Sequence, residues 1–195
     1  IWQLGEEAAA AANGQEPGDI KVQDVDGNGV ITTDDRIIYS QRPDVTFGFN
    51  NTFNYKGFDL SVFLYARLGQ WIAYDYNTTY RINALENGGN VDYWTPENPT
   101  NAFPRPNKSK SYTQVTYYST LKYEDGSFFK IRDITLGYTF KPELLKHLNL
   151  SRLRVYATAK NFFTFSKIDN YDPEQGGSIS FPMTKQLVFG LNVEF

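Results

Sequence analysis

The chain ends with Lys185-Gln-Leu-Val-Phe-Gly-Leu-Asn-Val-Glu-Phe195, a stretch in which one face of a strand is wholly apolar. That face carries Leu187, Phe189, Leu191, Val193 and Phe195, and the residues between them are Gln186, Val188, Gly190, Asn192 and Glu194. A strand of about 9–11 residues with one apolar and one polar face crosses a bilayer in a closed barrel with lipid outside and water inside. The stretch therefore predicts a transmembrane β-strand, with Phe195 in the aromatic girdle at the membrane edge.

The same two-residue period recurs in earlier stretches, which predicts strands over Val45–Tyr55, Gly57–Arg67, Asp133–Phe140 and Arg152–Phe162. Asn51 breaks the alternation. A soluble antiparallel sheet with one wet face shows the same period, but strands of such matched length favour the membrane barrel. We therefore expect an all-β fold, a transmembrane antiparallel β-barrel with long extracellular loops. Its membrane strands and turns would occupy residues 45–67, 128–162 and 185–195.

The composition agrees with a barrel. Aromatic residues make up 16% of the 195 residues, yet the mean hydropathy is −0.49, and no apolar run approaches the roughly 18 residues of a membrane helix. The net charge of −3 leaves no basic surface for nucleic acid, and the lack of cysteine excludes disulfides and thiol chemistry. The chain opens on Ile1-Trp-Gln-Leu4 without a signal peptide. We therefore expect the C-terminal piece of a longer protein, whose other strands close the barrel.

The connections between the predicted strands fall into two classes. Tyr55–Phe58 and Lys141–Ser151 are short, whereas Gly5–Asp44, Leu68–Ser127 and Phe163–Thr184 are much longer than ordinary connections. Outer-membrane barrels have short periplasmic turns and long extracellular loops. The short connections are therefore predicted to be periplasmic and the long ones extracellular.

Candidates for other chemistry are few. Trp71, Tyr93 and Trp94 lie in the longest connection and are interpreted either as solvated loop surface or as aromatics that stack on sugar rings or contact a partner. His147 is the only histidine, which excludes a histidine-based catalytic triad or a multi-histidine zinc site within the chain. We assign no catalytic residue and expect no enzyme activity.

Asp24-Val-Asp-Gly-Asn-Gly-Val-Ile-Thr-Thr-Asp-Asp35 matches the pattern of a calcium loop. Oxygen donors stand at its first, third and fifth positions, and Gly29 at the sixth allows the sharp turn. The predicted calcium ligands are Asp24, Asp26, Asn28, Val30 through its carbonyl, Thr32 directly or through water, and Asp35. A loop built on an Asx/Gly turn without metal is the other interpretation. We prefer a structural calcium ion that orders an extracellular loop.

Several blocks of the sequence resemble the SusC/RagA group of TonB-dependent outer-membrane transporters. The resemblance covers nearly the whole chain. It lies in Pro17-Gly-Asp-Ile-Lys21, Phe47-Gly-Phe49, Tyr55-Lys-Gly-Phe-Asp-Leu-Ser-Val-Phe63, Tyr123-Glu-Asp-Gly-Ser-Phe-Phe-Lys-Ile-Arg-Asp-Ile-Thr-Leu-Gly-Tyr138, Leu153-Arg-Val-Tyr156, Lys160-Asn-Phe-Phe-Thr-Phe165, Tyr171-Asp-Pro-Glu174 and Phe195.

The resemblance implies the C-terminal strands of a barrel of about 22 strands that an N-terminal plug occludes. It also implies the bacterial outer membrane as the location and its lipid as the surroundings. The implied partners are the plug and N-terminal strands of the same transporter, a SusD-like surface lipoprotein, and the TonB complex, which binds a region not in this chain. The implied activity is the energised import of glycans or peptides.

A soluble, secreted, calcium-stabilised β-rich carbohydrate-binding module is the alternative. A dockerin also contains calcium loops, but it normally carries two copies and only one is present here. A soluble module also has no need of so many exposed aliphatic side chains. Both arguments favour the transporter.

Overall fold

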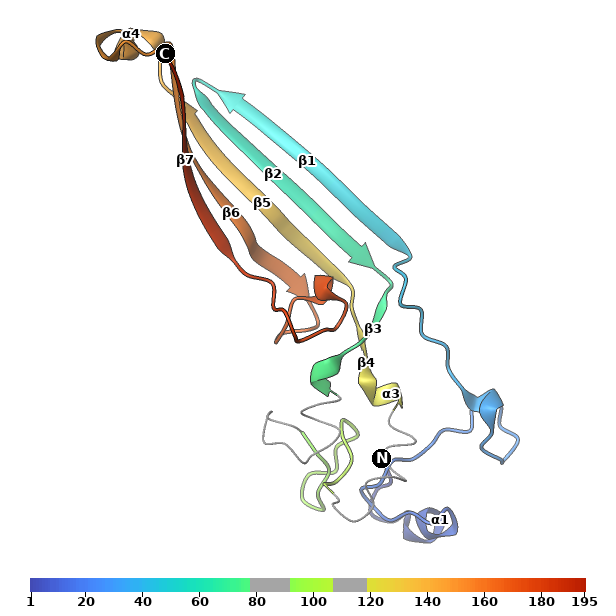
Figure 1. Ribbon diagram of the computed structural model, residues 1–195. Helices are drawn as coiled ribbons and strands as arrows, with labels where there is room; N and C mark the ends of the chain where they lie inside the picture. The colour runs from blue at the N-terminus through green and yellow to red at the C-terminus, as the bar shows by residue number, and fades with distance from the viewer. Residues whose placement is uncertain (78–91, 107–118) are drawn as a thin grey trace. The chain divides into compact units, whose positions relative to one another are not determined.

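The computed structural model describes residues 1–77, 92–106 and 119–195 (Figure 1). They form two compact units, each described here by itself. The first comprises Ile1–Ser40, Ile72–Glu124 and Gly176–Ile179, and the second comprises Gln41–Trp71, Asp125–Gln175 and Ser180–Phe195. Among the described residues, no helix combines the length and apolar character needed to cross a membrane.

The second unit is a five-stranded antiparallel sheet with the order β1-β2-β5-β6-β7. Within this sheet the spatial order is the order along the chain, with the separate pair β3 and β4 lying between β2 and β5 in the sequence. The strands span Val45–Tyr55 (β1), Phe58–Leu68 (β2), Phe128–Thr139 (β5), Arg152–Ser166 (β6) and Gln186–Glu194 (β7). The long twisted strands agree with the all-β fold predicted from the sequence.

The register places the alternating apolar residues of the five strands on one face, although a few apolar residues also lie on the opposite face. One row across the sheet joins Tyr55, Phe58, Tyr138, Val155 and Leu191 through successive strand pairs. Side chains on this apolar face remain largely open within the unit: Leu191 is 69% exposed and Phe189 is 75% exposed. Because a soluble fold buries such a face, its exposure is the arrangement expected of strands that meet lipid.

The two short connections lie at the same end of the sheet as the end of β7 (Figure 1). In the β1–β2 hairpin, Lys56 and Gly57 both have positive φ, 47° and 89°, as a two-residue turn with the right strand twist requires. The β5–β6 connection contains α4 (Pro142–Leu145) and η3 (Lys146–Leu148), and η3 is followed by Asn149 in the left-handed region. Both connections are as compact as the sequence predicts.

A local irregularity shifts the alternation in β5 and β6. The register slips between Ile131 and Asp133, so Arg132 lies outside the regular pairing, and Asn161 in β6 has a φ of 58°. Both strands continue beyond this point, to Phe128 and to Ser166. The predicted strand bounds at Asp133 and Phe162 are therefore too short, because a bulge resets the two-residue period that the prediction follows.

The first unit holds α1 (Glu7–Ala12), η1 (Thr33–Asp35) and α3 (Ser119–Lys122). The short strands β3 (Trp71–Ala73) and β4 (Tyr123–Asp125) pair with each other. The long Leu68–Ser127 connection thus has secondary structure of its own, although parts of it lie outside the described residues.

Trp94 belongs to the core of the first unit. It is only 5% exposed, and its indole N–H donates to the Gln3 side chain at 2.9 Å. A Cβ atom on Gly18 would press into its ring, and Gly18 has a φ of +88° that favours glycine. Interpreting Trp94 as an exposed stacking residue is therefore wrong, whereas Trp71 and Tyr93 are 37% and 44% exposed.

Candidate functional site

The polar face of the sheet is the side opposite the apolar rows. By register it carries Asp59, Ser61, Phe63, Tyr65 and Arg67 of β2, Phe128, Lys130, Asp133, Thr135 and Gly137 of β5, Arg154, Tyr156, Thr158, Lys160, Thr164 and Ser166 of β6, and Gln186, Val188, Gly190, Asn192 and Glu194 of β7. Cations and carboxylates on it form ion pairs between strands, such as Arg154 with Asp59 and Lys160 with Asp133.

Near the end with the short connections, Arg154 of β6 reaches across β5 to Asp59 of β2. The guanidinium Nε donates to Asp59 Oδ1 at 2.8 Å and Nη2 donates to Oδ2, which makes a two-pronged ion pair. The pair passes over Gly137, where an added Cβ atom would lie 2.6 Å from Arg154 Nη2. The absence of a side chain at Gly137 therefore allows one ion pair to join β2 and β6 across β5.

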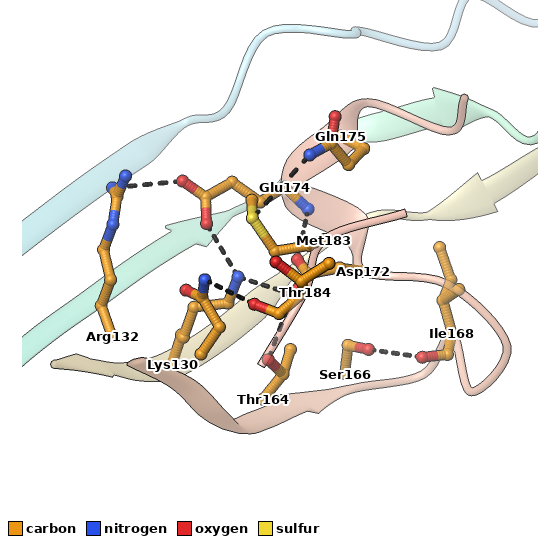
Figure 2. A network of polar contacts seen from close by, with 11 residues as sticks. Lys130, Arg132, Thr164, Ser166, Ile168, Asp172, Glu174, Gln175, Met183 and Thr184 are labelled. Carbon is orange, nitrogen blue, oxygen red and sulfur yellow. Dashed lines mark hydrogen bonds and ion pairs between the residues drawn. The ribbon is translucent and has the colours of Figure 1, made fainter. Parts of the chain in front are cut away.

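At the other end of β5, Lys130 is the centre of a buried polar network (Figure 2). Its side chain is 0% exposed, and its ammonium lies 2.6 Å from Asp172 Oδ2 and 2.8 Å from Glu174 Oε2. Arg132 Nη1 contacts Glu174 Oε1 at 3.1 Å. Both carboxylates come from the connection between β6 and β7, with Glu174 in η4 (Pro173–Gln175).

This β6–β7 connection, residues 167–185, is folded rather than extended. The Ser166 hydroxyl donates to Ile168 O at 2.7 Å, and the Glu174 amide donates to Asp172 Oδ1 at 3.0 Å. The Thr164 hydroxyl also reaches Asp172, at 3.4 Å. The connection thus carries its two carboxylates onto the polar face. Sequence reasoning missed this anchor, because alternation alone does not indicate which residues lie opposite Lys130.

The acidic loop, Asp24–Asp35, brings three of the predicted metal ligands together. Carboxylate oxygens of Asp24, Asp26 and Asp35 all lie within 4.8 Å of one another. Asp24 accepts hydrogen bonds from the amides of Gly27 and Gly29, each at 2.7 Å. The three carboxylates therefore converge because this short segment turns back on itself at the two glycines.

Asp35 closes the acidic loop from its far end. Its Oδ2 accepts from the Thr32 amide and its Oδ1 from the Val25 amide, both at 2.7 Å. These backbone hydrogen bonds, the one from Thr32 first, lower the pKa of the Asp35 carboxyl below its usual value. Asp35 therefore remains an ionised oxygen donor in the physiological range.

The other predicted ligands have different roles within the loop. The Asn28 side-chain oxygen accepts from the Val30 amide at 2.7 Å, and its amide group donates to Asp26 Oδ2 at 2.8 Å. The Thr32 hydroxyl accepts from the Asp34 amide at 3.1 Å and caps η1. In this loop, side-chain oxygens accept hydrogen bonds from many of the loop's own backbone amides.

The sequence is similar to that of several outer-membrane receptors. No protein-family model matches the chain. TonB-dependent receptor P3 of Formosa agariphila is 30% identical over 221 residues, which cover 100% of this chain and 21% of that receptor. TonB-dependent receptor SusC of Bacteroides thetaiotaomicron is 31% identical over 181 residues, which cover 88% of this chain and 17% of SusC. The chain thus spans about a fifth of the length of these relatives.

The chain is also similar in structure to solved transporters. The RagAB peptide transporter matches with a TM-score of 0.66 and 26% identity over 82% of this chain and 18% of that chain. The RagAB peptide importer in its "closed-closed" state matches with a TM-score of 0.65 and 27% identity over 90% of this chain and 20% of that chain. The resemblance to the SusC/RagA group and the predicted outer-membrane location are confirmed. These relatives are receptors and transporters rather than enzymes.

Proposed function

We propose that this relative of the outer-membrane TonB-dependent receptors supplies five adjacent strands to the barrel wall of an active importer of glycans or peptides. The observation that carries the proposal is the five-stranded sheet with one exposed apolar face and one charged face. The match of the whole chain to TonB-dependent receptor P3 supports it. The similarity to SusC and to a structure named as a peptide transporter supports import as the activity.

In this proposal the apolar face contacts lipid and the polar face lines the barrel interior. The edge strands β1 and β7 pair with strands from the rest of the transporter, because an unpaired edge in lipid costs several kcal/mol for each unsatisfied backbone group. The rest of the protein also provides the plug that fills a barrel of about 22 strands and the segment that contacts TonB.

The topology follows from the connection lengths. The turn at Lys56-Gly57 and the connection with α4 face the periplasm, and the long connections face outward. The outward side would then meet a SusD-like surface lipoprotein. Tyr93, which is 44% exposed, lies in one of these outward connections and would contact the lipoprotein or the substrate.

The acidic loop is proposed to hold one structural calcium ion. Three carboxylates whose oxygens lie within 4.8 Å of one another offer the hard oxygen ligands that calcium prefers. Asn28, the Val30 carbonyl and Thr32, directly or through water, would complete the coordination. Calcium would offset the mutual repulsion of Asp24, Asp26 and Asp35 and fix the loop.

The test is uptake by intact bacteria. Cells that lack the full-length transporter, cells that lack TonB and wild-type cells are supplied with labelled oligosaccharides or labelled oligopeptides. We expect uptake of one of the two classes to require both proteins. If both mutants took up both classes as well as wild-type cells do, the import proposal would be wrong. Recovery of the protein from the soluble secreted fraction would favour the carbohydrate-binding module.

A further inference from the structure

Two arginines on the polar face flank a single tyrosine. Arg67 of β2 donates through Nε to the Tyr65 hydroxyl at 2.8 Å, and its Cζ lies 5.6 Å from the centre of the Tyr65 ring. The Cζ of Arg132, from the bulge in β5, lies 5.4 Å from the centre of the same ring. Cation–π contacts hold both guanidinium groups beside one aromatic side chain.

The charges of this region do not balance. Lys130 and Arg132 together meet the carboxylates of Asp172 and Glu174. Arg67 has no carboxylate partner within residues 1–77, 92–106 and 119–195. One positive charge is therefore left over at a place where two guanidinium groups lie against the same ring.

One of the two arginines, Arg132, already contacts a carboxylate. Glu174 already places one carboxylate oxygen 3.1 Å from Arg132 Nη1. Arg132 is still 41% exposed and has further N–H donors. Lys130, by contrast, is fully enclosed by its two carboxylates and is not available to a ligand.

We propose that Arg67 and Arg132 form a binding site for carboxylate groups of the imported oligomer. This rests on the proposed function, in which the polar face lines the import path. The guanidinium fork matches a carboxylate with two parallel hydrogen bonds, and its fixed position beside Tyr65 reduces the conformational entropy lost on binding. A uronic-acid glycan and an acidic peptide share this carboxylate chemistry.

The experiment measures binding to the full-length transporter purified in detergent. The probes are tetra-galacturonate and tetra-glutamate, with the neutral tetramers of galactose and glutamine for comparison. We expect wild-type protein to bind one of the acidic tetramers more tightly than its neutral counterpart. Arg67→Gln should weaken binding of that acidic tetramer by roughly tenfold or more, the usual scale for a hydrogen bond to a charged group, and Arg132→Gln should act in the same direction.

Arg152→Gln is the matched control, since it removes an arginine from an exposed ion pair with Glu194 at the opposite end of the sheet. It should leave binding of all four probes unchanged. Arg67→Lys keeps the charge and should retain more of the binding than Arg67→Gln, which separates recognition from a defect in folding. Heat-modifiable gel migration checks the barrel of each variant.

The result also identifies the source of the carboxylate, because only the glycan or only the peptide should respond to Arg67→Gln. Equal binding of acidic and neutral tetramers by the wild type would overturn the site, as would an equal loss caused by Arg152→Gln. If uptake requires TonB and the transporter but shows no preference for acidic probes, this inference alone is rejected. If wild-type cells show no uptake that depends on TonB and the transporter, the proposed function is rejected.

Discussion

The ring of Tyr156 occupies the space that a side chain at Gly190 would need. The two residues are register partners in β6 and β7, and a Cβ atom built on Gly190 would overlap the tyrosine ring. The guanidinium of Arg154 lies 4.8 Å from the centre of the same ring and binds Asp59. Gly190 therefore leaves space for the Tyr156 ring, which contacts the arginine of the ion pair between β6 and β2.

Gly190→Ala should destabilise the sheet by about 1–3 kcal/mol, because Tyr156 must leave its position and the ion pair must adjust. Gly48→Ala in β1 is the matched control, since the nearest atom to a Cβ there is Phe63 Cε2 at an ordinary 3.7 Å. Urea unfolding of the full-length protein, followed by heat-modifiable gel migration, measures both. Equal stability of the two variants would show that the space beside Gly190 is not needed.

Leu191→Arg should cost roughly 2–4 kcal/mol in folded barrel, because it places a charge near the middle of β7 on the exposed apolar face, which in the proposed function meets lipid. Asn192→Arg places the same charge on the polar face and should be mild. Both residues lie in regular pairing with β6, at Val155 and Arg154 respectively, so the variants differ chiefly in the face they alter. Similar losses of folded barrel in the two variants would reject the assignment of the faces.

The alternation of apolar residues was enough to predict most of the sheet. β1 spans the predicted Val45–Tyr55, and β7, Gln186–Glu194, lies within the predicted final stretch. Alternation works here because each strand has a mainly apolar face and a mainly polar face, which gives the two-residue period. It fails at Arg132, where a bulge inserts one residue and reverses the period.

The networks on the polar face could not be predicted in the same way. Lys130 and Asp172 are 42 positions apart in the sequence, and only the folded β6–β7 connection brings them together. The acidic loop was predictable because its donors recur at fixed spacing within one short segment. Trp94 was misjudged, since nothing in its local sequence shows that Gly18 leaves room for its ring.

Lys130→Met should release the β6–β7 connection from the polar face. The change leaves Asp172 and Glu174, which are only 12% and 10% exposed, without their main cation, and such losses cost about 3–5 kcal/mol for a buried pair. We expect faster protease cleavage and faster hydrogen exchange within residues 167–185.

Lys160→Met is the control for this anchor, because its contact with Asp133 is longer, at 3.4 Å, and Lys160 is 47% exposed. An exposed pair of this kind contributes about 0–1 kcal/mol. If both lysine variants left the β6–β7 connection equally protected, the buried network would not be what holds it in place.

The paired change Asp24→Asn/Asp26→Asn should remove calcium binding from the acidic loop. Two of the three carboxylates whose oxygens lie within 4.8 Å would lose their charge while keeping their shape, so the attraction for a divalent cation would fall without a large change in packing. Asp34→Asn is the matched control, since Asp34 lies next to Asp35 but contributes no oxygen to that group. Metal analysis of the full-length protein should find one calcium ion per chain in the wild type and the control.

Calcium removal should also loosen the acidic loop but leave the sheet intact, because the hydrogen bonds between strands do not depend on the ion. Chelation of the wild-type protein should therefore speed protease cleavage within residues 24–35 while heat-modifiable migration of the barrel stays the same. The double variant should be cleaved quickly with or without chelator. The metal site would be rejected if chelator did not change the cleavage rate of the wild-type loop. Calcium–oxygen distances far outside about 2.3–2.6 Å in a structure solved with calcium would also reject it.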